Sequence, residues 1–129
     1  MRLALVLLAA LCLSNSVGAA DKKKQPDITI IESKAARAGG IISVDGKVKN
    51  TSEKAIKSLV LLFDFMAPGK QVITTQRGGV DDEVLQPGQE SSFRVELQDP
   101  VRAVEYRYNA EDGSGKELRV GNPGPRYIE

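Results

Sequence analysis

Three separate runs of the sequence alternate apolar and polar residues with a period of two. In IISVDGKVKN, residues 42, 44, 46 and 48 share one face, and polar residues occupy the other. The runs SSFRVEL and AVEYRY repeat the pattern, with Phe93 to Leu97 and Val104 to Tyr108 facing inward at every second position. Successive side chains of a β-strand point to opposite faces, so these runs are typical of antiparallel strands with one face in water.

A fourth run, LVLLFDFM at residues 59–66, is apolar on both faces, and only Asp64 interrupts its second face. That face must be covered, because it otherwise exposes an apolar patch. Two interpretations stay open: cover from within the chain, by the 28–31 strand, the C-terminal segment or long side chains of a neighbouring strand, or contact with another protein. For Asp64, if buried, we expect a lysine or a backbone donor in a turn as its partner. The candidate interface residues are Val60, Leu62 and Met66.

Turn-forming residues separate these runs at regular intervals along residues 27–120. No segment between them keeps a 3.6-residue period, so we expect almost no helix. The dipeptides at 68–69 and 87–88 are both Pro-Gly, which favours type II turns. The spacing predicts an all-β fold, a single antiparallel immunoglobulin-like β-sandwich of about seven strands.

The two ends of the chain differ from this middle part. Residues 1–20 combine Arg2, an apolar run at 3–13 and small residues before position 21, which predicts a cleaved signal peptide. The run is too short to span a bilayer, so we expect export to a periplasmic or secreted location and no stable membrane insertion after cleavage. Residues 21–26 (DKKKQP) are interpreted as a flexible charged arm, and the Pro- and Gly-rich residues 121–129 as an extended tail without regular structure.

The amino-acid composition limits the catalytic and metal-binding chemistry that the chain can carry. The chain has no histidine, and its single cysteine, Cys12, lies in the predicted signal peptide. Removal of that peptide also leaves equal numbers of basic and acidic residues, so nothing attracts nucleic acid at long range. A Ser-His-Asp triad, a histidine-ligated metal and a thiol nucleophile are all excluded from the mature chain. We therefore expect that the protein is not an enzyme and that it has no cofactor.

Three polar features remain as candidates. Asp81, Asp82 and Glu83 form the densest acidic cluster, a possible acidic loop site for calcium, although adjacent residues of an extended chain splay apart. The segment 50–52 is a glycosylation sequon that is more simply interpreted as a turn, where Asn50 tolerates left-handed geometry. Tyr106 and Tyr108 could stack on a sugar, but their place in an inward row favours the core, with each hydroxyl finding a partner near the rim.

Four short motifs resemble those of FxLYD-type domains of exported prokaryotic proteins. They are GKVKNTS at 46–52, VLLFD at 60–64, GKQV at 69–72 and LQPG at 85–88 followed by Phe93. Val60 stands where the signature has Phe, and Phe63 stands where it has Tyr. The resemblance implies an immunoglobulin-like or fibronectin-like module of the cell envelope or exterior, with no common catalytic site.

These observations support one leading functional hypothesis and one alternative. The leading hypothesis is an exported, non-catalytic β-sandwich module that binds a protein partner, a second copy of itself or a cell-envelope component. Its contact surface would be the face of Val60, Leu62 and Met66, or an open sheet edge that accepts an added strand. The alternative is a carbohydrate- or calcium-binding domain that uses loop residues, Asp81, Asp82 and Glu83 among them.

Overall fold

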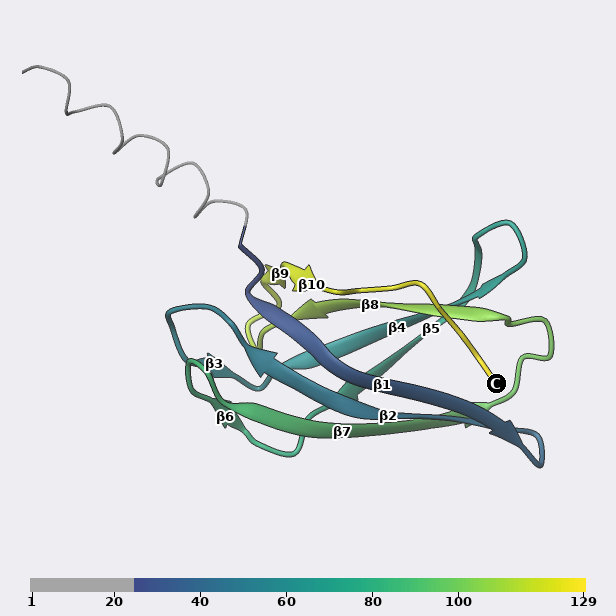
Figure 1. Cartoon of the computed structure of the whole chain (residues 1–129), viewed down its shortest axis with the longest axis horizontal. Helices are drawn as coiled ribbons and strands as arrows, with labels where there is room; N and C mark the ends of the chain where they lie inside the picture. The colour runs from purple at the N-terminus through teal and green to yellow at the C-terminus, as the bar shows by residue number, and fades with distance from the viewer. Residues whose placement is uncertain (1–24) are drawn as a thin grey trace, which may run out of the picture.

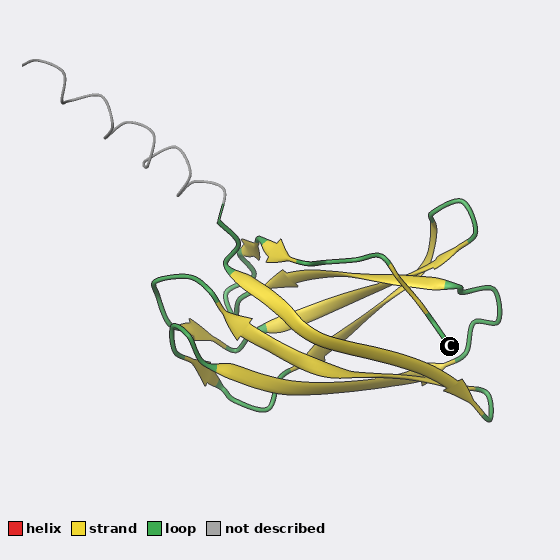
Figure 2. Cartoon of the chain, viewed as in Figure 1, coloured by secondary structure: helices red, strands yellow, loops and turns green. Residues whose placement is uncertain are grey.

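Two β-sheets lie face to face in the computed structural model, which describes residues 25–129 (Figure 1). No helix occurs among these residues (Figure 2). The predicted all-β sandwich is therefore confirmed. The predicted signal peptide, 1–20, lies outside the described residues, and of the predicted arm only Gln25 and Pro26 lie within them.

The first sheet has the strand order β10-β1-β2-β7. Its strands are β1 (Ile28–Ala38), β2 (Ile41–Asn50), β7 (Glu90–Gln98) and the short β10 (Val120–Gly121). β1 and β2 form a hairpin, β2 pairs antiparallel with β7, and β10 pairs with β1 in the parallel direction. The parallel pair departs from the purely antiparallel sheet that the alternation predicts.

The second sheet has the order β11-β8-β4-β5, with β9 also paired to β8. It contains β4 (Val60–Ala67), β5 (Gln71–Gly79), β8 (Glu105–Glu111), β9 (Glu117–Leu118) and β11 (Arg126–Tyr127). A separate two-stranded ribbon joins β3 (Ile56–Lys57) to β6 (Val84–Leu85). The described residues therefore form eleven strands, six of them long, where the sequence predicts about seven. The division of the long strands, β1, β2 and β7 against β4, β5 and β8, is the immunoglobulin-like arrangement.

The core fills the space between the two sheets. All four inward residues of the 59–65 row are buried, as are the inward aliphatic residues of β2, which confirms both predicted faces. The rings of Phe63, Phe93 and Tyr108 meet at its centre, with centroids 5.0 to 5.8 Å apart. Val104 is an exception, because it precedes β8 and is 36% exposed although the alternation places it inward.

Gly46 occupies a position in β2 that a larger residue could not. β1 has a bulge between Ile30 and Glu32, which brings the Glu32 carbonyl toward β2. A Cβ at Gly46 would lie 2.1 Å from that carbonyl oxygen and 2.7 Å from the Phe93 ring. The glycine therefore allows a strand bulge and an inward aromatic ring to meet at one point.

Both Pro-Gly turns have the predicted form. Gly69 and Gly88 have φ of 87° and 83°, as the third residue of a type II turn requires. Each turn is closed by a backbone hydrogen bond, from Lys70 N–H to Ala67 O at 3.2 Å and from Gln89 N–H to Gln86 O at 2.9 Å. These turns join β4 to β5 and β6 to β7.

The C-terminal segment is not free of regular structure, so that part of the prediction for residues 121–129 is wrong. It contains the end of β10 and all of β11, and it runs beside β8 before it crosses toward the end of β1 (Figure 1). Ile128 N–H donates to Val104 O, and Glu129 N–H donates to Ala35 O. The tail therefore bonds to both sheets and closes one side of the sandwich.

Candidate functional site

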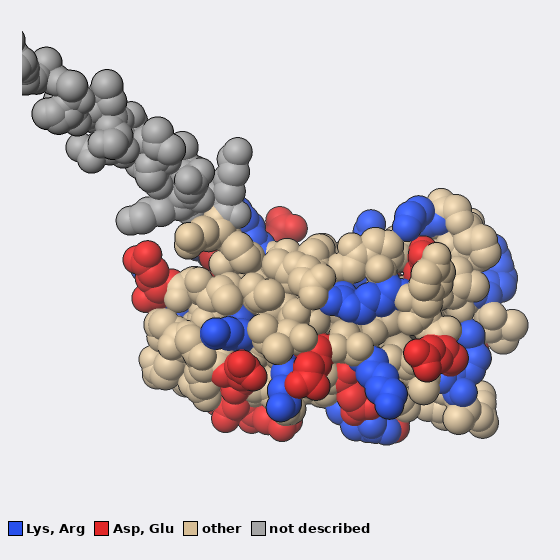
Figure 3. Space-filling model, viewed as in Figure 1, with Lys and Arg blue, Asp and Glu red and all other residues tan. Residues whose placement is uncertain are grey.

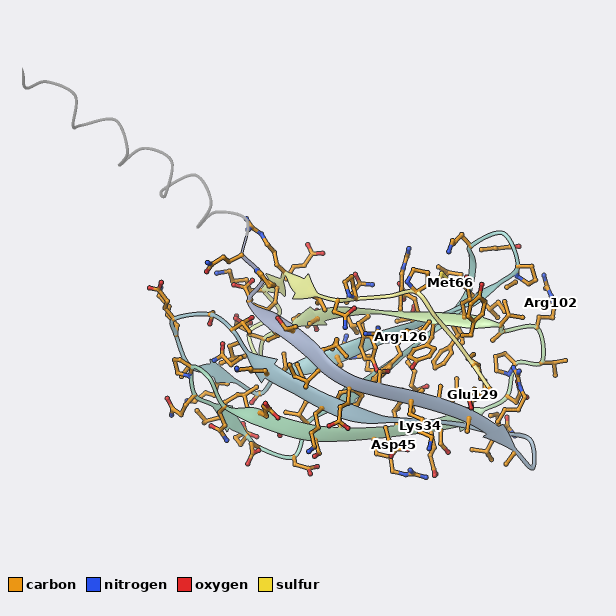
Figure 4. The ribbon with its side chains drawn as sticks, in the orientation of Figure 1. Lys34, Asp45, Met66, Arg102, Arg126 and Glu129 are labelled. Atoms are coloured by element: carbon orange, nitrogen blue, oxygen red, sulfur yellow. The ribbon has the colours of Figure 1, made fainter. Side chains whose placement is uncertain are left out.

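The predicted interface on the outer face of β4 does not lie open. Val60 and Leu62 are only partly buried, but Met66 is fully buried, so its place on an exposed contact surface is wrong. At Met66 the pairing register shifts, because β5 bulges at Ile73, and Met66 lies opposite Val72 of β5 and Glu105 of β8 (Figure 4). It does not belong to the main core cluster, and it is buried beneath the outer surface instead.

Long side chains of the two neighbouring strands cover this face. Arg77 of β5 and Glu111 of β8 form a salt bridge with an Nη2–Oε1 distance of 2.7 Å, which crosses β4 beside Val60 and Leu62. At the other end of β4, Lys70 and Glu105 approach to 3.4 Å across Met66. Of the two interpretations of the doubly apolar strand, the structure favours cover by neighbouring side chains.

Asp64 lies between these two bridges and is fully engaged. Thr75 Oγ1 donates to Asp64 Oδ1 at 2.7 Å, and Asn109 Nδ2 donates to Oδ2 at 2.9 Å. Arg107 Nε also donates to Oδ2, at 3.3 Å. The expectation of a lysine or backbone partner is wrong, because the partners are side chains of the strands on both sides. This arrangement satisfies a nearly buried carboxylate and leaves it no free oxygen for chemistry.

The acidic cluster at 81–83 is a connection between strands. Asp81 N–H donates to Ser92 O at 2.9 Å, and Asp82 N–H donates to Ser91 Oγ at 3.0 Å, so the segment lies along the start of β7. The Glu83 carboxylate accepts a hydrogen bond from the Ser58 hydroxyl. Within residues 25–129, no three His, Cys, Asp or Glu side chains are grouped as metal ligands would be. The geometry gives no support to a calcium site here.

Asn50, the acceptor residue of the sequon, is fully buried. Its Nδ2 donates to Lys54 O and Leu85 O, both at 2.8 Å, and its Oδ1 accepts from the amide and hydroxyl of Ser52. Asn50 does not have a positive φ, so the turn depends on its side chain and not on left-handed backbone. The amide that glycosylation would modify is thus fully used in holding the turn.

Tyr106 and Tyr108 belong to the core, as the alternation predicts. Both hydroxyls lie 2.6 Å from Ser33 Oγ, in the middle of β1, so each phenol has the polar partner that its burial requires. Burial raises the pKa of both phenols above the ordinary value, more than the Ser33 contact lowers it. Arg126 of the tail stacks over the Tyr108 ring at 5.5 Å, which attaches the tail to this cluster (Figure 4). Neither ring is available to stack on a sugar.

The sheet edges are unequally protected. The tail covers the edges of β1 and β8, and the 81–82 segment covers the first half of β7. The rest of β7 carries Arg94 and Glu96, which point into solvent and bind Asp45 and each other. Charged side chains of this kind disfavour the addition of another strand.

β5 is the edge strand that no other segment covers and that has almost no charge, and a bulge at Ile73 is its one irregularity. Within the described residues it pairs only with β4, and the other side of its backbone has no strand partner. Arg77 is its single charged residue, and this side chain is bound to Glu111. The sequence predicts an open sheet edge but does not identify the strand. The signal was present in the uncharged run at 71–76 and the glycine pair that follows Arg77.

The outer face of the first sheet offers no comparable surface. Basic and acidic side chains are interspersed over β1, β2 and β7, without an area of one sign (Figure 3). The Arg94–Asp45 bridge at 2.6 Å lies on this face. Within residues 25–129, no helical segment has the length and apolarity needed to cross a bilayer.

No protein-family model matches the sequence, and no curated protein matches it either. The FxLYD resemblance therefore stays a prediction. Solved structures do share the fold. One is IrmA from Escherichia coli, with a TM-score of 0.50 and 12% identity over 81% of this chain and 99% of IrmA. Another is the β-glucuronidase of Bacteroides uniformis, with a TM-score of 0.50 and 16% identity, where the match spans 78% of this chain but 12% of the enzyme. At such identities the similarity shows the fold alone.

Proposed function

We propose that this chain is an exported, non-catalytic β-sandwich module that binds a protein partner by accepting a strand at β5. The observation that carries the proposal is the uncovered and almost uncharged edge of β5, Gln71–Gly79, in a molecule whose other long edges are covered or charged. An open edge offers a row of unpaired amides and carbonyls to an extended segment, and this is a common mode of peptide recognition.

Two further observations support a binding role over catalysis. The mature chain lacks histidine and cysteine. Asp64, the most deeply buried carboxylate, is hydrogen bonded on both oxygens. Export is inferred from residues 1–20, whose composition is that of a signal peptide.

A comparison of two matched variants tests the binding site. Val72 on β5 is 43% exposed and Ile31 on β1 is 42% exposed, so Val72→Lys and Ile31→Lys add the same charge at equally open positions on different sheets. We expect wild type and Ile31→Lys to retain the same envelope protein in affinity capture, and Val72→Lys to lose it. Equal capture by both variants would place the binding site elsewhere.

Export has its own test. Expression of the whole 129-residue chain, followed by mass spectrometry of the protein outside the cytoplasm, should show a mature form beginning near residue 20 or 21. An unprocessed chain retained in the cytoplasm would contradict the export part of the proposal.

A further inference from the structure

The two halves of β5 differ in the bulk of their side chains. Residues 72–75 are Val, Ile, Thr and Thr, all β-branched, whereas residues 78 and 79 are both glycine. Gly79 is exposed, and a Cβ built there meets no atom within 4 Å. A Cβ at Gly78, in contrast, would lie 3.3 Å from Phe63 Cε1 and 3.6 Å from Val95 of β7, so this glycine packs against the core. The first half of the open edge therefore projects side chains, and the empty space beside its other end lies at Gly79.

We propose that β5 pairs antiparallel with β5 of a second copy of this chain, across a two-fold axis at Gln76. This inference rests on the proposed function and names its partner. Antiparallel pairing about that residue uses the regular part of β5 that begins at Thr74, after the bulge at Ile73. It places Thr74 of each strand opposite Gly78 of the other and brings the bulged Ile73 toward the open Gly79. Such an interface is isologous, as closed dimers generally are. A parallel arrangement in the same register would bring bulky residues against one another and leave the glycines facing glycines.

Charge is compatible with the same arrangement. Arg77 would lie opposite Thr75 of the other copy, so no like charges face each other, and Arg77 stays bound to its own Glu111. The mature chain has equal numbers of basic and acidic residues, which removes long-range repulsion between copies. The pairing would join the two second sheets into one continuous sheet. Because an edge contact buries less than a standard interface, we expect a dissociation constant on the order of micromolar.

Sedimentation velocity of the protein purified from expression of the whole chain measures this association. We expect the mass to rise from one copy to two between about 1 and 500 µM. Gly79→Lys fills the empty space, and its backbone conformation is one that any residue can adopt, so it should melt like wild type while associating at least about tenfold more weakly. Ile31→Lys should associate like wild type. A single-copy mass throughout, or undiminished association of Gly79→Lys, would overturn the proposal.

Disulfide trapping tests the register itself, in a Cys12→Ser background. Residues that face each other across antiparallel strands have Cα atoms about 4.5–5.5 Å apart, within disulfide range. Gln76→Cys should therefore cross-link two copies on mild oxidation. Gln71→Cys, at the start of the same strand, should not, because the two copies of residue 71 would be far apart. Equal cross-linking at both positions, or none at 76, would reject the two-fold pairing.

These results separate the inference from the proposed function. A monomeric protein without cross-linking at 76, whose captured envelope partner is still lost on Val72→Lys, would refute self-pairing and leave the binding module intact. Loss of both self-association and edge-dependent capture would refute both.

Discussion

Arg77 and Glu111 belong to strands that do not touch, and their salt bridge passes over the strand between them. The Nη2–Oε1 distance is 2.7 Å, and the bridge crosses β4 beside Val60 and Leu62. An exposed ion pair contributes little through its charges, typically about 0–1 kcal/mol. Its larger effect here comes from the stem of the arginine, because long side chains shield apolar surface from water.

A pair of substitutions at Arg77 separates these two contributions. Arg77→Met keeps an unbranched stem and removes the charge, whereas Arg77→Ala removes both. We expect Arg77→Ala to lower the free energy of unfolding by about 1 kcal/mol and Arg77→Met to lower it by less than half of that. Urea unfolding at low and at high salt measures both. If both variants lost the same unfolding free energy, and this loss disappeared at high salt, the charge pair alone would be responsible.

Asp64 leads to a second prediction, because its nearly buried carboxylate accepts hydrogen bonds from three side chains. Asp64→Ala leaves Thr75 and Asn109 without their acceptor, and an unsatisfied group of this kind costs about 1–3 kcal/mol. Asp45→Ala is the matched control, since Asp45 is an exposed carboxylate bound to Arg94. We expect the control to lose under about 1 kcal/mol in the same unfolding measurement. Similar losses at the two positions would contradict the structural role assigned to Asp64.

The aromatic centre of the core leads to a third prediction. Phe63 and Phe93 lie 5.8 Å apart between the sheets, and both are buried. Truncation of either to alanine should reduce the free energy of unfolding by about 3–5 kcal/mol, from lost burial and a residual cavity. Tyr127→Ala is the control, because this ring is 77% exposed and its loss should change stability by under about 1 kcal/mol. Losses below about 1 kcal/mol at both phenylalanines would show that the core lies elsewhere.

Local patterns predicted most of the core, and the errors arise where distant segments meet. The alternation identified the inward rows because burial on one side of a sheet imposes a period of two on the residues themselves. The sequence predicts an open face at Met66 because it does not show that Lys70 and Glu105 pass over this side chain. The three partners of Asp64 lie 11, 43 and 45 residues along the chain, on the two neighbouring strands β5 and β8, beyond the range of any local pattern.

The prediction for the tail is wrong for a related reason. Its two short strands depend on the exposed edges of β1 and β8 and have no hydrophobic period of their own. Its Pro and Gly residues correctly indicated the absence of a long strand, but not that the segment is attached to both sheets. Among the candidate sites, β5 was difficult to identify because the openness of an edge depends on the order of strands, which alternation does not determine.

Gly46 leads to a prediction that compares two glycines in neighbouring sheets. A methyl group at Gly46 would overlap the Glu32 carbonyl, which is backbone and cannot move without disturbing the β1 bulge. We expect Gly46→Ala to lower the free energy of unfolding by about 2–3 kcal/mol or to prevent folding. Gly79→Ala should be neutral or stabilising by up to about 1 kcal/mol, because the site is open and its φ is not positive. Equal effects at the two glycines would contradict the described bulge.

The fifth prediction concerns acid stability and the contact between Arg37 and Asp99. Arg37 Nε donates to Asp99 Oδ2 at 2.6 Å, and the Val101 amide donates to Oδ1 at 2.7 Å. These hydrogen bonds, with that from Arg37 the larger, hold the pKa of Asp99 below its ordinary value. A carboxyl whose pKa is lower in the folded state binds protons more readily in the unfolded state. Its stabilising contribution is therefore complete above the unfolded pKa of about 4 and is lost as the pH falls through the lower folded value.

Urea unfolding of wild type and Asp99→Asn, from neutral pH to below the ordinary pKa of aspartate, tests the predicted direction of this pH dependence. The difference in unfolding free energy between the two proteins should be constant from neutral pH to about pH 5 and should shrink steadily below about pH 4. Asp112 supplies an internal comparison, because its pKa is also lowered, chiefly by the Ser114 hydroxyl, and its contribution remains in both proteins. Wild type and Asp99→Asn should therefore both weaken in acid, with the steeper decline in wild type. If the difference in unfolding free energy instead grew as the pH fell, the contacts with Arg37 and Val101 would not lower the pKa of Asp99.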